Sequence, residues 1–109
     1  MTEKVLGKIV SAEYGMVIDY PFLFGLQLRF HLGDGTSIGC GSKYTENIGE
    51  ACKWTKEERQ YGITKSVDEV HKILKDAKVY YVSQLVGKPV EVTIDRNCFK
   101  DFRILTEVL

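Results

Sequence analysis

Three of the arginines in this chain have the chemistry to recognise an anion. Arg29 falls on the polar side of an alternating segment, Arg59 falls in the first turn of an expected helix, and Arg103 interrupts an apolar segment near the C-terminus. The planar guanidinium presents paired donors that match the oxygens of a phosphate or a carboxylate. The competing interpretation is that these arginines form surface ion pairs with the acidic residues, which are common and weak in folded proteins.

Aromatic residues near these arginines could supply a stacking surface for a nucleobase. Tyr20, Tyr44 and Trp54 lie close to them in the sequence or in the expected topology. Arginine forks on phosphates and rings stacked on bases are together a common means of holding a nucleotide. The candidate ligand-binding residues are Arg29, Tyr44, Trp54, Arg59 and Arg103.

Metal binding and catalysis have weaker support in the residue pattern. The cysteines and histidines are not paired as Cys-x-x-Cys or His-x-x-x-His, and the chain has neither a Gly-x-Ser-x-Gly elbow nor a Walker loop. A cysteine and a histidine distant in sequence could still meet, but any chain with three cysteines and two histidines offers such a pair. We therefore expect no metal, no cofactor and no enzymatic activity. The residues concerned are His31, Cys40, Cys52, His71 and Cys98.

Four glycines follow one another closely between residues 33 and 41. Gly33 and Gly35 flank Asp34, as expected for the turn of a tight hairpin. Gly39 and Gly41 are two residues apart in the expected return strand, so they share one face of it. A strand face without side chains lets a ligand or a ring approach closely, whereas the alternatives are tight packing against the helix or a β-bulge.

The elements that would position these residues begin with strands. A short apolar-rich strand is expected over residues 8–14, and residues 36–41 should form the return strand of the hairpin. The strongest alternation runs from Tyr20 to Leu32, and period two places one of its faces in a core. The apolar side chains of that face are Phe22, Phe24, Leu26, Leu28, Phe30 and Leu32.

A single long helix is expected after a loop over residues 42–54. Thr55 and Glu58 form a capping box that marks its start. Gly62 costs a helix about 1 kcal/mol relative to alanine, so the helix should bend there or begin after it. The apolar stripe that should face the core consists of Ile63, Val67, Val70, Leu74 and Ala77.

Strand character returns after the helix. Residues 83–86 read as one helical turn capped by Ser83, and Gly87 ends it. Residues 89–94 alternate, residues 95–97 form a turn, and a last strand should occupy residues 99–108. This order predicts an α+β fold with a mainly antiparallel β-sheet and one main α-helix packed on one face, in a single domain spanning residues 1–109.

Length, charge and cysteine usage narrow the function classes. The chain has 109 residues, and 15 basic residues balance 15 acidic ones. A net charge of zero argues against disorder and against nucleic acid as the partner, and it leaves self-association into a homo-oligomer plausible. The absence of a secretory signal or a membrane-length apolar run, with an odd number of cysteines, predicts a cytoplasmic protein without membrane contact.

The C-terminal half carries a resemblance to other proteins. A group of short bacteriophage and prophage proteins resembles this chain over roughly residues 52–109. The segments that carry the resemblance are Trp54-Thr55-Lys56-Glu57-Glu58-Arg59, Lys75-Asp76-Ala77-Lys78-Val79, Gln84-Leu85-Val86-Gly87-Lys88-Pro89-Val90-Glu91-Val92-Thr93 and Arg103-Ile104-Leu105-Thr106-Glu107-Val108-Leu109. That group ends in a Gly-Lys-Pro strand and an Arg-Ile-Leu-Thr-Glu-Val tail. The chain is also similar in size and character to phage anti-defence proteins, among them the Thoeris anti-defence sponges, which sequester cyclic nucleotide signals.

This resemblance implies a phage protein acting in the host cytoplasm. Combined with the arginine and aromatic residues, it leads to our first hypothesis, a non-catalytic anti-defence protein that binds and sequesters a cyclic-nucleotide-type immune signal. The alternative is a protein–protein inhibitor of a host defence enzyme, similar to an anti-CRISPR. The expected partners are thus a small nucleotide-derived ligand, further copies of the chain, or a host defence protein.

Overall fold

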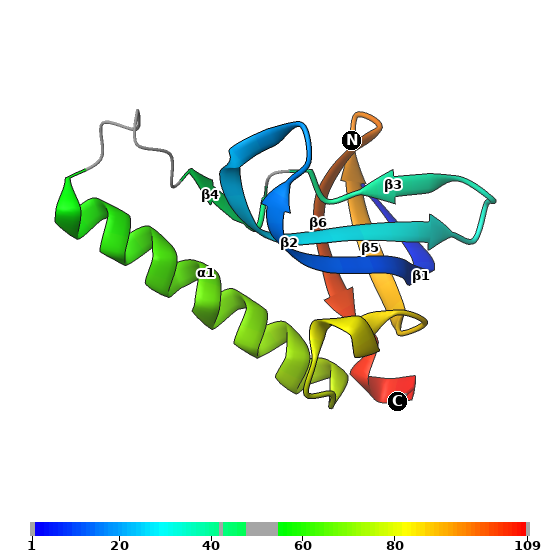
Figure 1. Cartoon of the computed structure of the whole chain (residues 1–109). Coiled ribbons are helices and arrows are strands. Elements are labelled where there is room, and N and C mark those ends of the chain that lie inside the picture. Colours follow the sequence, from blue (N-terminus) through cyan, green and yellow to red (C-terminus); the bar gives the residue numbers. More distant parts are fainter. Residues whose placement is uncertain (1, 42, 48–54, 109) are drawn as a thin grey trace.

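The computed structural model describes residues 2–41, 43–47 and 55–108. Six antiparallel strands form one sheet, ordered β3-β2-β1-β5-β6, with β4 also paired to β2. One long helix, α1, lies along one side of this sheet (Figure 1). The predicted α+β class is therefore confirmed. The elements are β1 (Thr2–Val17), β2 (Tyr20–Leu32), β3 (Ser37–Gly39), β4 (Thr45–Asn47), α1 (Lys56–Ala77), η1 (Val82–Leu85), β5 (Pro89–Asp95), β6 (Cys98–Ile104) and η2 (Thr106–Val108).

Strand β2 is the central element of the fold, and its bounds are those that the alternation predicted. Its side chains from Leu26 to Leu32 at even positions are buried, as expected. The prediction fails at Phe22, which is 46% exposed. Phe22 lies near the turn of the long β1–β2 ribbon, and β5 pairs with β1 only over residues 2–8, so the end of the ribbon projects beyond β5.

Strand β1 is much longer than the predicted residues 8–14. It begins at Thr2, because its first half pairs with β5, and it ends at Val17, because its second half continues along β2. The register with β2 shifts between Ile9 and Ser11, which is a β-bulge. Because charged residues interrupt the apolar pattern near the N-terminus, alternation did not predict the first half of this strand.

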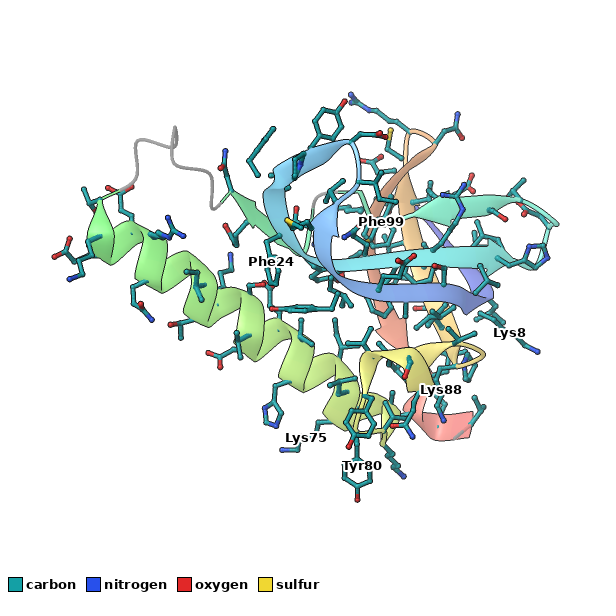
Figure 2. All side chains as sticks on the ribbon, in the orientation of Figure 1. Lys8, Phe24, Lys75, Tyr80, Lys88 and Phe99 are labelled. Atoms are coloured by element: carbon teal, nitrogen blue, oxygen red, sulfur yellow. The ribbon has the colours of Figure 1, made fainter. Side chains whose placement is uncertain are left out.

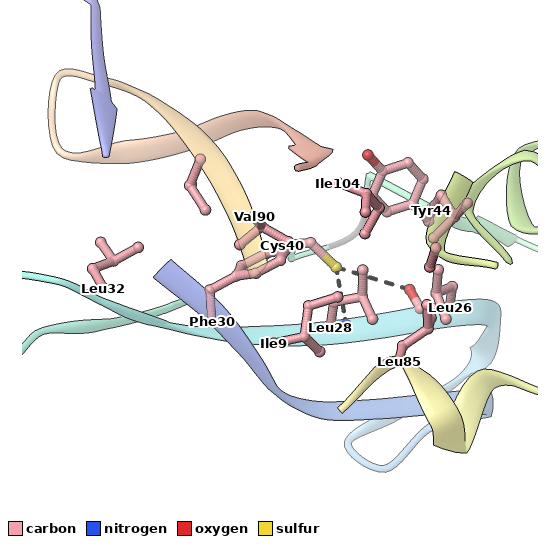
Figure 3. Close-up of a cluster of buried hydrophobic side chains, with 13 residues drawn as sticks. Ile9, Leu26, Leu28, Phe30, Leu32, Cys40, Tyr44, Leu85, Val90 and Ile104 are labelled. Carbon is pink, nitrogen blue, oxygen red and sulfur yellow. Dashed lines mark hydrogen bonds between the residues drawn. The ribbon is translucent and has the colours of Figure 1, made fainter. Parts of the chain in front are cut away.

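The sheet curls over its own core. In the sheet order β2 and β6 are separated by β1 and β5, yet the ring of Phe30 on β2 stacks on that of Phe99 on β6, with centroids 5.6 Å apart. Phe102 of β6 approaches the same ring at 5.1 Å. The space between the two strands is thus filled by side chains, with Phe99 among them (Figure 2). The fully buried large side chains around this cluster are Ile9, Leu26, Phe30, Leu85, Val90 and Val92 (Figure 3).

Helix α1 starts at the predicted cap but presents a different face. Thr55 Oγ1 accepts a hydrogen bond from Glu58 N at 3.1 Å, and the helix runs unbroken through Gly62 to Ala77, so the expected bend or later start is wrong. The stripe prediction is also partly wrong, because Val67 is 52% exposed whereas Gly62 and Ser66 are buried. The buried face of the helix thus includes two small residues, Gly62 and Ser66.

Turns and short elements were predicted less well than the long ones. At the first hairpin only Gly35 has a positive φ (92°), and Asp34 Oδ1 accepts from Thr36 N at 2.9 Å. The turn after β5 has positive φ at Arg96 and Asn97, as a two-residue hairpin turn requires.

Three boundaries differ from the prediction. Strand β3 covers only Ser37–Gly39, β4 lies inside the expected loop, and β6 ends at Ile104, where η2 follows. Ser83 does not cap η1: Tyr81 holds the cap position, and Gln84 Oε1 accepts from the backbone N–H groups there. No helix in the described part of the chain is long and apolar enough to cross a membrane.

Candidate ligand-binding groove

The three arginines proposed as ligand contacts line three different cavities. Arg29 borders a groove along the outer edge of β2, Arg59 a small cavity between the ribbon and α1, and Arg103 a cavity between α1 and β6. Figure 2 shows Phe24, which lines the Arg59 cavity, projecting between the ribbon and the helix. A single copy of the chain therefore does not bring the three guanidinium groups together.

Arg103 is occupied by acidic neighbours. Its Nη1 lies 3.1 Å from Glu107 Oε1, and its Nε lies 3.3 Å from Glu91 Oε1. These hydrogen bonds, first that to Glu107 and then that to Glu91, raise the pKa of Arg103. The surface ion-pair interpretation therefore describes Arg103 well.

Tyr44 packs inside the fold. It is 8% exposed, its hydroxyl lies 3.5 Å from Asp101 Oδ1, and its ring meets that of Phe102 edge to face at 5.9 Å. Burial, followed by the charge of Asp101, raises the pKa of Tyr44. Both faces of its ring are thus unavailable for stacking on a base. Trp54, the other proposed stacking residue, lies outside the described residues.

The groove beside Arg29, which we call the Arg29 groove, has a volume of about 640 Å³. The part of its lining that belongs to described residues contains one basic side chain and no carboxylate. In the described part of the chain, no acidic side chain pairs with Arg29. The lining residues are Val17, Tyr20, Leu23, Gln27, Leu28, Arg29, Gly39, Cys40 and Gly41.

The two glycines of the predicted side-chain-free strand face both line this groove. A Cβ on Gly39 would lie 3.6 Å from Leu28 O and 3.9 Å from Arg29 Nη1, which are ordinary contacts. A Cβ on Gly41 would meet nothing within 4 Å, although its φ of 59° favours glycine. Neither glycine packs against the helix, and their missing side chains leave the groove open next to the guanidinium.

Cys40 closes the inner end of the groove. Its Sγ accepts a hydrogen bond from Leu28 N at 3.2 Å and lies 3.9 Å from Leu26 O, as the dashed lines in Figure 3 mark. Burial raises the pKa of the Cys40 thiol. A buried, protonated thiol is a poor nucleophile, so Cys40 acts here as a structural residue.

Two further residues give the groove an aromatic wall and an amide. Tyr20 is 56% exposed, and its ring contacts Phe22 edge to face at 6.1 Å. The Gln27 side-chain amide donates to Gly15 O at 3.4 Å. The candidate set omitted both residues, although Gln27 and Arg29, two residues apart on one strand, share a face by alternation.

Within the described residues, no three His, Cys, Asp or Glu side chains gather as a metal site requires. No known protein-family model matches the chain, and no curated protein or solved structure matches it.

Proposed function

We propose that this is a phage-encoded, non-catalytic anti-defence protein that binds and sequesters a cyclic-nucleotide-type immune signal in the Arg29 groove, in the cytoplasm of the host cell. The phage setting comes from the resemblance of the C-terminal segments. The binding of an anion is supported mainly by one observation: among the described residues, Arg29 has no acidic partner and its groove has no carboxylate in its lining.

The lining residues divide into a charged part and an apolar part. Arg29 offers the donors for one phosphate group, and the open strand at Gly39 leaves space for it. Tyr20 offers a ring face for a base, and Leu23 contributes an apolar wall. A nucleotide-type anion matches both parts, whereas an uncharged apolar ligand would leave the guanidinium desolvated without a partner.

The ionisable side chains that line the groove favour binding of a ligand over its chemical conversion. These side chains are Tyr20, Arg29 and Cys40. Burial raises the pKa of the Cys40 thiol. General acid–base chemistry near neutral pH uses groups that titrate there, and burial moves the pKa of the Cys40 thiol further from that range.

Calorimetry tests this proposal with cyclic dinucleotides, cyclic trinucleotides and cyclic ADP-ribose isomers as the titrants. We expect at least one to bind, and Arg29→Ala to weaken its binding by about 10- to 100-fold, since a hydrogen bond to a charged group contributes ~1.5–3 kcal/mol. Arg29→Lys keeps the charge without the paired donors of the guanidinium, so its affinity should lie between those of the wild type and Arg29→Ala. The proposal is wrong if none of the ligands binds at high micromolar concentration.

Gly39→Val supplies a second variant that fills the groove without disturbing the fold. The added Cβ meets only ordinary contacts, and valine favours a strand, so the melting temperature should stay close to that of the wild type. We expect its ligand affinity to fall together with that of Arg29→Ala. If Gly39→Val folds and its ligand affinity is unchanged, the ligand binds elsewhere on the protein.

The second candidate function, inhibition of a host defence enzyme by direct contact, is favoured by a different feature. The end of the β1–β2 ribbon exposes apolar side chains, with Ile18 91% and Met16 64% exposed. Exposed apolar residues of this kind are common in protein-binding surfaces. In an infection assay, Ile18→Asp should abolish protection of the phage if the ribbon end binds the enzyme. It should leave protection intact if the Arg29 groove acts alone.

A further inference from the structure

The second half of β1 has a strand on only one of its sides. On the side away from β2, the ladder with β5 ends at the pair Lys8 and Pro89. One further backbone contact follows, in which Ile9 N donates to Lys88 O at 3.1 Å and Ile9 O accepts from Gly87 N at 2.7 Å. In the described part of the chain, no strand pairs with residues 11–17 on that side.

The pairing of β2 determines which residues of β1 direct their backbone N–H and C=O groups to this open edge. Leu26 N donates to Tyr44 O and Leu28 O accepts from Cys40 N, so the even-numbered residues of β2 face β3 and β4. The odd-numbered ones therefore face β1, where Gln27 is paired with Glu13. Alternation along β1 then directs the N–H and C=O groups of Ala12 and Tyr14 to the open edge.

Few of the usual protections of an exposed edge are present here. Natural edge strands carry lysines, prolines or inward-pointing charges that prevent pairing with another chain. Residues 11–17 contain no lysine and no proline, and Glu13 is the only charged residue among them. Tyr14 is 41% exposed and Met16 64%. With respect to the described residues, this strand edge has no partner strand for Ala12 and Tyr14, and its apolar side chains are partly exposed.

We propose that this edge pairs in antiparallel fashion with the same edge of a second copy, about a two-fold axis at Tyr14. Tyr14 then lies opposite its own copy, as an aromatic cross-strand pair, and Ala12 lies opposite Met16 of the second copy. Backbone hydrogen bonds form within the Tyr14 pair, because Tyr14 directs its N–H and C=O groups to the open edge. At the Ala12–Met16 pair, Met16 O also accepts from Gln27 Nε2 at 3.5 Å within its own copy. The result is one sheet that continues through both copies.

The charges along the edge favour this register, and the net charge permits a second copy as the occupant. With the axis at Tyr14, the carboxylate of Glu13 lies opposite Gly15 of the second copy, so no like charges face each other. A register centred on Glu13 would oppose two carboxylates. The chain has a net charge of zero, so long-range repulsion does not keep two copies apart.

Gly15 provides a matched pair of variants for testing this register. A Cβ at Gly15 would meet nothing within 4 Å, so neither variant clashes within the chain, and any backbone strain is the same in both. Gly15→Lys places an ammonium group opposite Glu13 of the second copy, and Gly15→Glu places a carboxylate there. In sedimentation equilibrium at low salt, we expect dimer dissociation constants that differ by about tenfold, with Gly15→Lys the tighter dimer.

Hydrogen exchange identifies the edge directly. The amides of Ala12 and Tyr14 should exchange quickly in dilute protein and slowly at concentrations where the dimer forms. A chain that remains monomeric at all concentrations overturns the proposal. So does a dimer in which these amides stay unprotected, a dimer that forms only with an unrelated protein, or two Gly15 variants with equal dissociation constants. Both measurements are made on the protein without a ligand, so failure of ligand binding would not affect this result.

Discussion

Cys40 replaces a backbone acceptor at the point where two short strands leave a gap. Strand β3 pairs with β2 at residues 29–31 and β4 at residues 23–25, so the β2 backbone between them needs other partners. Tyr44 O accepts from Leu26 N, and the sulfur of Cys40 accepts from Leu28 N. An unpartnered buried N–H group would cost about 1–3 kcal/mol, so this thiol contributes to the stability of the sheet.

The Cys40 thiol should also make stability depend on pH. Burial raises its pKa in the folded state, whereas a thiol in the unfolded chain ionises near about 8.5. Its contribution to the free energy of unfolding is therefore complete below that pH and falls as the pH rises above it. In urea denaturation at several pH values, the wild type should lose stability between about pH 8 and 10 more steeply than Cys40→Ser. Parallel curves would contradict this prediction.

At the scale of single elements, Gly25 allows β4 to pair with β2. A Cβ at Gly25 would lie 2.8 Å from Thr45 Cα and would also overlap Tyr44 O, both of which are backbone atoms that cannot turn away. Gly25→Ala should therefore displace β4 and lower the free energy of unfolding by about 1–3 kcal/mol, as overpacking typically does.

Gly15→Ala is the matched control for this variant in chemical denaturation. Gly15 and Gly25 have similar φ angles, 158° and 153°, but a Cβ at Gly15 would meet nothing within 4 Å. The control therefore carries the backbone strain without the overlap, and it should change stability less. Equal losses for Gly25→Ala and Gly15→Ala would show that the approach of β4 does not require a glycine.

Helix α1 depends on its N-cap, since few of its residues are fully buried. Its buried residues are Gly62, Ser66, Ile73 and Ala77, so tertiary packing supports the first turn little. Thr55→Ala removes the acceptor of the Glu58 N–H and should cost about 1 kcal/mol. Thr55→Ser keeps the hydroxyl and should restore most of that loss. A common urea midpoint for both variants would contradict the role of the cap.

At the scale of the whole molecule, Phe30 keeps the curled sheet closed. It is fully buried and contacts Phe99 and Phe102 on a strand that is not its neighbour in the sheet. Phe30→Ala should lower the free energy of unfolding by about 3–5 kcal/mol, through lost burial and the cavity left behind. Phe22→Ala, at a half-exposed position on the same strand, should cost far less in thermal or urea denaturation. Similar losses would mean that the contact between β2 and β6 does not close the sheet.

The features that the sequence predicted correctly are those decided by a few neighbouring residues. Alternation defined the bounds of β2, Thr55 marked the start of α1, and Asp95-Arg96-Asn97 indicated a turn. Each depends on side-chain periodicity, a local cap or permissive φ values, all of which are set by residues within the same strand, helix end or turn.

Only the tertiary structure decided the remaining features, because they depend on which distant segments meet. Thr2–Lys8 is a strand because β5 lies beside it, and Thr45–Asn47 is a strand because Gly25 admits it. Which helix face is buried depends on how close the helix lies to the sheet. The same is true of the candidate site. The sequence by itself determined that arginines, tyrosines and a glycine-rich strand were available. The fold decided that Arg103 is ion-paired and that Tyr44 is buried. It also placed Arg29 beside Gly39 and Gly41, where no acidic side chain of the described residues pairs with it.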